Sequence, residues 1–169
     1  MTLAEARVIV EGLIFAAERP LSAKEIGEII GLDQPAVEAL VEEIRRQHMS
    51  GALAIRMVAG GYQMVTKPEL APWIEKLGRP VVHAPLSAAA TETLAIIAYE
   101  QPITRAEIEQ IRGVRSDSAL TNLLDRGLIC EVGRKEGPGR PILYGVTDKF
   151  LEHFGLRSIE ELPLKSIGQ

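Results

Sequence analysis

The chain has 169 residues, of which 46% are hydrophobic and 25% are charged, and its formal net charge is −4. This balance is typical of a folded globular protein and argues against disorder. Residues 1–78 carry 8 Lys and Arg against 11 Asp and Glu, and residues 79–169 carry 11 against 12, so neither half has the basic excess of an autonomous nucleic-acid binder.

Two features of the sequence bear on the cellular compartment. No apolar run approaches the ~18 residues of a membrane span, and Glu5, Arg7 and Glu11 interrupt the segment where a signal peptide needs a clean apolar run. From these two features we expect a cytoplasmic protein without a membrane partner.

Cys130 is the only cysteine and lies in an apolar stretch, which favours a buried strand thiol over a reactive nucleophile.

The first half predicts three helices, a hairpin and a short closing helix, at residues 3–18, 22–31, 33–49, 54–66 and 69–77. The Arg19-Pro20 step ends the first helix because proline disfavours a helical residue before it. Ser22 and Glu25 form a capping-box pattern, in which each side chain accepts the other residue's backbone N–H at a helix start. Gly31 fits the left-handed end of the second helix.

The second half repeats this order, with a third helix at 116–126, strands at 128–132 and 142–146, and a short helix at 148–154. Pro102-Ile103-Thr104-Arg105-Ala106-Glu107-Ile108 answers Pro20-Leu21-Ser22-Ala23-Lys24-Glu25-Ile26 at an offset of 82 residues. The same offset relates Ile14 to Ile96 and Gly31 to Gly113. A shared register without a gap indicates one supersecondary unit used twice.

Three helices followed by a two-stranded hairpin are typical of the winged helix, a helix-turn-helix with an attached wing. We therefore predict an α+β, mainly helical fold of two tandem winged-helix domains. Their expected limits are residues 1–78 and 86–156, with a linker at 79–85 and a short tail at 157–169. The second wing has a long basic connection rich in glycine and proline, residues 133–141.

The second half closely resembles the segregation and condensation protein B family of bacterial chromosome-segregation proteins. The resemblance is carried by LAIIAYEQPITRAEI (94–108), IRGV (111–114), LLDRGLI (123–129) and GRPILYG (139–145). The first half matches more loosely, through EGLIFAA (11–17) and PLS (20–22).

This resemblance implies tandem winged helices, a homodimer formed by the first domain, and a second domain that binds the kleisin subunit, segregation and condensation protein A. That kleisin bridges the two heads of an SMC ATPase dimer, so the implied role is chromosome condensation and segregation at the nucleoid during the cell cycle and cell division. The family is not enzymatic, and no catalytic, cofactor or metal residue carries over. The sequence agrees, because His48, His83 and His153 are scattered and no metal-ligand spacing, phosphate loop or nucleophile elbow is present.

The alternative function is a tandem winged-helix DNA-binding transcriptional regulator. In the first presumed recognition helix, Glu38, Glu42 and Glu43 would repel phosphates. Residues 105–140 hold 7 basic and 6 acidic side chains, which leaves little net attraction for DNA. The candidates for weak DNA contact are Arg134, Lys135 and Arg140 on the wing, with Arg112, Arg115, Asn122 and Arg126 near the third helix.

The repeat also predicts where other chains bind. In the second copy Leu94, Ile97 and Ala98 face the core, and an offset of 82 places Gly12, Phe15 and Ala16 on the core side of the first copy. That would leave a candidate dimer surface formed by Ala6, Val10, Leu13, Ile14 and Ala17. Alternatively, the first core wraps this helix differently, or the linker covers it.

Ile96 and Tyr99 lie off the predicted core direction of the second copy. We interpret them as a candidate site for an apolar kleisin segment, with Tyr99 offering ring area and a hydroxyl. A position of Tyr99 beneath the wing or against the linker is the alternative.

Overall fold

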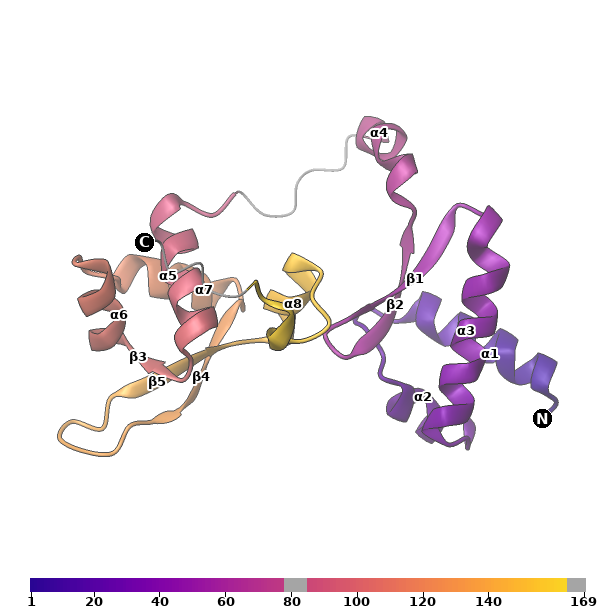
Figure 1. Cartoon of the computed structure of the whole chain (residues 1–169), viewed down its shortest axis with the longest axis horizontal. Helices are drawn as coiled ribbons and strands as arrows, with labels where there is room; N and C mark the ends of the chain where they lie inside the picture. The colour runs from indigo at the N-terminus through magenta and orange to yellow at the C-terminus, as the bar shows by residue number, and fades with distance from the viewer. Residues whose placement is uncertain (78–84, 164–169) are drawn as a thin grey trace. The chain divides into compact units, whose positions relative to one another are not determined.

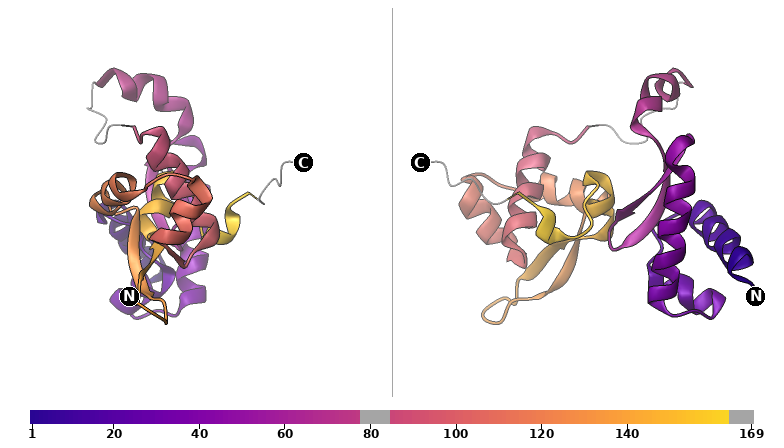
Figure 2. Two further views of the ribbon diagram at one scale, coloured as in Figure 1. Left: turned by 90° about the vertical axis from the view of Figure 1, so that its left-hand side faces the viewer. Right: turned by 45° about the vertical axis from the view of Figure 1, so that its right-hand side comes forward.

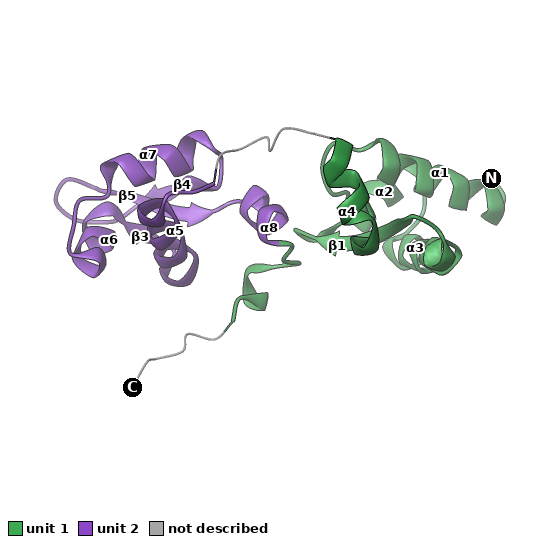
Figure 3. Cartoon of the chain, turned by 90° about the horizontal axis from the view of Figure 1, so that it is seen from above, with its two compact units in different colours: residues 1–82, 155–169 green, residues 83–154 purple. Residues whose placement is uncertain are grey.

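The computed structural model describes residues 1–77 and 85–163, which fall into two compact units, residues 1–77 with 155–163 and residues 85–154 (Figures 1 and 3). Apart from residue 85, the predicted linker at 79–85 lies outside the described residues, as do His83 and the last six residues of the predicted tail.

The first unit contains three helices, α1 (Leu3–Ala16), α2 (Ala23–Ile30) and α3 (Gln34–Gln47), then strands β1 (Leu53–Val58) and β2 (Gly61–Thr66). A short helix, α4 (Ala71–Ile74), is flanked by single turns of 3₁₀ helix at Pro68–Leu70 and Glu75–Leu77. The two strands pair antiparallel around Ala59 and Gly60, whose φ values of 48° and 69° make a tight two-residue turn. The core is closed by α1, α2, α3 and the inner face of the hairpin.

The second unit contains α5 (Ala88–Glu100), β3 (Ile103–Thr104), α6 (Arg105–Arg112), α7 (Asp117–Asp125), β4 (Ile129–Arg134), β5 (Ile142–Val146) and α8 (Asp148–Phe154). Its three strands form an antiparallel sheet in the order β3-β5-β4. The β4–β5 hairpin extends beyond the helices of its unit (Figure 2). Each unit is thus a winged helix, and the predicted fold class, α+β and mainly helical, is confirmed.

The repeat holds closely from the second helix of each unit onward. Ser22 and Thr104 both form complete capping boxes with the glutamate three residues later, and Gly31 and Gly113 both end their helices with φ near 70°. The backbone pairing is repeated as well, since Leu21 pairs with Tyr62 as Ile103 pairs with Tyr144. Both residues of the second pair lie 82 positions after their counterparts in the first pair. This offset is kept because the greater length of α3 over α7 is balanced by the greater length of the second wing.

The first helices do not follow this offset. Six residues separate α1 from α2, whereas four separate α5 from α6. Relative to the helix that follows it, α1 therefore ends two residues earlier than α5 does. Structurally equivalent residues of α1 and α5 are 84 positions apart in the sequence, not 82. Buried residues of the two helices then match, as Ala6 with Ala90, Val10 with Leu94 and Ile14 with Ala98.

This shift corrects the predicted orientation of α1. Two residues correspond to about 200° of helix rotation, so the face expected in the core turns toward solvent. Gly12, Phe15 and Ala16 are exposed. Ala6, Val10 and Ile14, predicted to form a dimer surface, are instead buried in the core of their own unit, and Leu13 and Ala17 are half-buried beside them.

The chain after α8 returns to the first unit. The backbone N–H groups of Ala59 and Gly60 donate to the carbonyls of Leu156 and Arg157, both at 2.9 Å. These bonds tie Leu156, the last residue of the predicted second domain, and Arg157, the first of the predicted tail, to the turn of the first wing, and both residues belong to the first compact unit.

The capping boxes predict a pH dependence of stability. Hydrogen bonds from Arg19 and Ser22 lower the pKa of Glu25 to about 2, and bonds from Lys135 and Thr104 do the same for Glu107, against an ordinary value of 4.5. Because both folded pKa values are depressed, each carboxylate stabilises the fold above pH 4.5, and this contribution is lost as pH falls toward 2. The double variant Glu25→Gln, Glu107→Gln should be less stable than wild type at pH 7.

We expect this gap in unfolding free energy to shrink between pH 4.5 and 2, as measured by urea unfolding followed by circular dichroism. Glu28→Gln, outside both boxes, controls for loss of a carboxylate. A gap that stays constant over this range would contradict the assignment.

Candidate functional site

Helix α1 carries an apolar stripe on its solvent side, which we call the outer stripe. It consists of Ala4, Val8, Gly12 and Phe15, flanked by Ile9 and Ala16. The spacing of four, four and three residues places the first four on one helix face. Val8 is 60% exposed and Phe15 is 70% exposed, so the helix is apolar on both its buried and its solvent side.

The charged side chains of α1 are engaged beside this stripe. Arg7 donates to Glu43 of α3 at 3.3 Å, and the Glu11 carboxylate lies 2.7 Å from Nε2 of His48. Both contacts lie on the side of the helix that faces α3. Glu5 is exposed at the edge of the outer stripe, on the same side of the helix as Gly12, where its carboxylate accepts a 2.8 Å hydrogen bond from the backbone N–H of Thr2. The four stripe residues themselves are uncharged, as is typical of the centre of a protein-contact surface.

The second unit presents the predicted kleisin residues on α5. Tyr99 is 39% exposed and Ile96 is half-buried, and their spacing of three places them next to each other on the outer face of the helix. They form a small amphipathic patch rather than a continuous apolar stripe.

The basic residues of the second wing do not act together. The Lys135 ammonium lies 2.5 Å from the carboxylate of Glu107, which neutralises its charge and ties the wing to the start of α6. Arg134 donates to the carbonyl of Arg140 at 3.3 Å. Of the three candidates for weak DNA contact, two are thus held by contacts within the wing or to the adjacent helix.

The other basic candidates are brought together. Arg112, Arg115, Asn122 and Arg126 line one cavity between the start of α5 and the α6–α7 turn. The sequence showed these residues separately, and only the fold shows that they converge.

Within residues 1–77 and 85–163, no group of His, Cys, Asp and Glu side chains is arranged to hold a metal ion. No helix in this part of the chain has the length and apolar character needed to cross a membrane.

Comparison with known proteins gives consistent results. The family model of the segregation and condensation complex subunit ScpB matches residues 8–165. Segregation and condensation protein B of Symbiobacterium thermophilum is 52% identical over 159 residues, covering 93% of this chain and 72% of that protein. The crystal structure of ScpB from Mycobacterium tuberculosis is 31% identical and covers 92% of this chain and 98% of that one, with a TM-score of 0.45.

A further solved structure is a dimer of an ScpB N-terminal domain complexed with a ScpA peptide. It is 28% identical, covers 44% of this chain and 96% of that one, and has a TM-score of 0.43.

The orientation of α1 yields a stability prediction. Ile14→Ala should lower the free energy of unfolding by about 2–5 kcal/mol, because it leaves a cavity in the core. Phe15→Ala should change it by no more than about 0.5 kcal/mol, because the ring is solvated within the single chain. Urea unfolding should be followed at several chain concentrations and compared at the lowest, where self-association contributes least. The reverse order of the two effects would restore the offset of 82 for this helix.

Proposed function

Because this chain belongs to the family of the segregation and condensation complex subunit ScpB, we propose that it is the homodimeric, non-catalytic accessory subunit of a bacterial SMC–kleisin complex. In this role it binds the kleisin ScpA, reaches the SMC ATPase through that kleisin, and acts in the cytoplasm at the nucleoid. Two surfaces support the proposal: the outer stripe for self-association and the α5 patch for the kleisin.

The outer stripe supports a two-fold dimer. Val8 and Phe15 are exposed to water in a single unit. A two-fold dimer formed through the outer stripe would bury both residues in each of the two protomers. Burying a side chain of this size contributes about 1.5–3 kcal/mol before the cost of association is subtracted. A Cβ at Gly12 would meet nothing within 4 Å, so this position lets a partner backbone approach closely.

We predict that Val8→Glu combined with Phe15→Glu yields a folded monomer. Two desolvated carboxylates at each copy of the stripe would oppose association, while exposed positions leave the core of the unit intact. Multi-angle light scattering measures the mass, and circular dichroism confirms folding. Ile29→Glu on α2, which is also 60% exposed, is the matched control and should remain dimeric. A stripe variant that stays dimeric would exclude this surface.

The α5 patch supports binding of a linear segment. Ile96 provides an apolar side chain, and Tyr99 adds a partly solvated ring that one or two residues of a partner can cover. A kleisin segment bound here would be held by a few buried anchors within a larger contact.

The kleisin assignment predicts that Ile96→Asp combined with Tyr99→Asp weakens binding of purified ScpA by roughly tenfold or more, because both anchors are lost. Isothermal titration calorimetry measures the affinity. Val132→Asp, at another half-exposed apolar position of the same unit, is the control. Undiminished affinity in the folded double variant would remove these residues from the site, and failure of the wild-type chain to bind ScpA would overturn the proposed function.

A further inference from the structure

One cavity of the second unit combines positive charge with a partly apolar lining. Its volume is about 460 Å³. The described lining contains three guanidinium groups and no carboxylate, and its residues are Pro85, Ser87, Ala89, Arg112, Val114, Arg115, Ser118, Ala119, Asn122 and Arg126. They come from the start of α5, the α6–α7 turn and α7.

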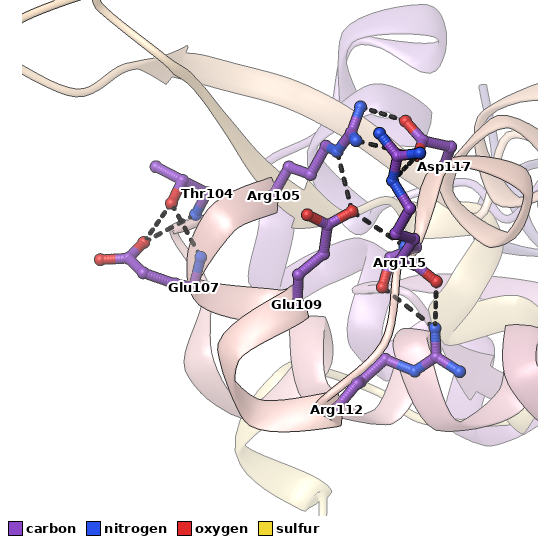
Figure 4. Close-up of polar contacts among 8 residues, drawn as sticks. Thr104, Arg105, Glu107, Glu109, Arg112, Arg115 and Asp117 are labelled. Carbon is purple, nitrogen blue, oxygen red and sulfur yellow. Dashed lines mark hydrogen bonds and ion pairs between the residues drawn. The ribbon is translucent and has the colours of Figure 1, made fainter.

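Arg112 is built into the wall of this cavity, with its side chain only 5% exposed. Its Nε donates to Glu92 at 3.0 Å. Its Nη1 donates to the Ser116 hydroxyl at 3.0 Å and to the Arg115 carbonyl at 3.3 Å (Figure 4). Its Nη2 makes no hydrogen bond with any residue of 1–77 or 85–163. A nearly buried cation is therefore held in one position with donor capacity to spare.

The surrounding carboxylates hold this arrangement without filling the cavity. Asp117 accepts a 2.8 Å hydrogen bond from Arg105, and Nε of Arg115 lies 3.8 Å from the same carboxylate (Figure 4). Glu109 accepts from the backbone N–H of Ser116 at 2.9 Å, which fixes the turn before α7. Arg115 itself is 88% exposed and stands at the rim.

The α5 patch, Ile96 and Tyr99, lies further along the helix whose start lines the cavity. Ala89 lines the cavity, and Ile96 and Tyr99 follow it by seven and ten residues, which places all three on one side of α5. Ten residues of helix span about 15 Å. Glu92, whose carboxylate accepts a hydrogen bond from Arg112, lies between Ala89 and the α5 patch on this side of the helix. An extended partner that crosses this carboxylate meets positive charge at the start of α5 and apolar contacts near its end.

We propose that this cavity binds an acidic side chain of the kleisin segment, whose neighbouring apolar residues cover Ile96 and Tyr99. This inference rests on the proposed function and adds a charge requirement to it. The guanidinium groups match a carboxylate in sign and geometry, and Val114 and Ala119 receive the aliphatic part of the same side chain.

DNA fits this site less well than a peptide. The cavity is a concavity that admits a single projecting side chain, whereas a phosphate backbone is tracked by cations along a ridge or groove. Helix α7 would be the groove-reading helix, and it begins with Asp117 and ends with Asp125. Two carboxylates at these positions repel phosphates.

The test uses the full chain and purified full-length ScpA in isothermal titration calorimetry at 50 and 300 mM salt. Arg115→Glu combined with Arg126→Glu should weaken binding by roughly tenfold or more and remove most of the salt dependence. Arg115→Lys combined with Arg126→Lys keeps the charge and should recover most of the affinity. Arg134→Glu combined with Arg140→Glu on the wing makes the same total charge change outside the cavity and should bind as wild type.

The outcomes separate the two proposals. If the folded reversal variant, Arg115→Glu with Arg126→Glu, binds ScpA as tightly as the wild type does, the cavity does not bind the kleisin. The proposed function then still stands. No binding by the wild type overturns both. If the reversal variant keeps its ScpA affinity but loses binding to an arbitrary fluorescent DNA duplex, the cavity is a phosphate site and the peptide assignment is wrong.

Discussion

The length of the connection between the first two helices determines which face of α1 is buried. Each helical residue corresponds to a rotation of about 100°. The connection between α1 and α2 has two more residues than the one between α5 and α6, so the buried face of α1 is rotated by about 200° from the position that an offset of 82 predicts. The core of the first unit then closes on Val10 and Ile14, and Val8 and Phe15 are left in water. Helix α1 thus has one apolar side in the core of its unit and a second apolar side in solvent, which the proposed dimer would cover.

Two copies of one fold thus acquire different surfaces. The first unit presents an apolar stripe that we propose pairs with itself under two-fold symmetry. The second presents a patch and a cationic cavity on one side of α5, suited to an extended partner of opposite charge. The proposed function assigns self-association and recognition of a linear segment to separate units.

Local chemistry made most of the fold predictable, and long-range geometry accounts for the rest. The capping boxes at Ser22 and Thr104 and the terminal glycines Gly31 and Gly113 depend only on neighbouring residues, and all were predicted correctly. The rotation of α1 was predicted wrongly, because a helix apolar on two sides has no single periodic phase and its orientation is set by a loop. The arginine cavity was missed as a unit, because its members converge only once the α6–α7 turn packs beside the start of α5.

Thiol accessibility at position 15 tests the role of the outer stripe most directly. In a Cys130→Ser background, Phe15→Cys should react quickly with a thiol reagent in dilute solution and more slowly as chain concentration rises, because association covers it. Ile14→Cys should react slowly at every concentration. Slow labelling of position 15 even at high dilution would place it in the core, and a rate independent of concentration in a dimeric sample would exclude the stripe from the interface.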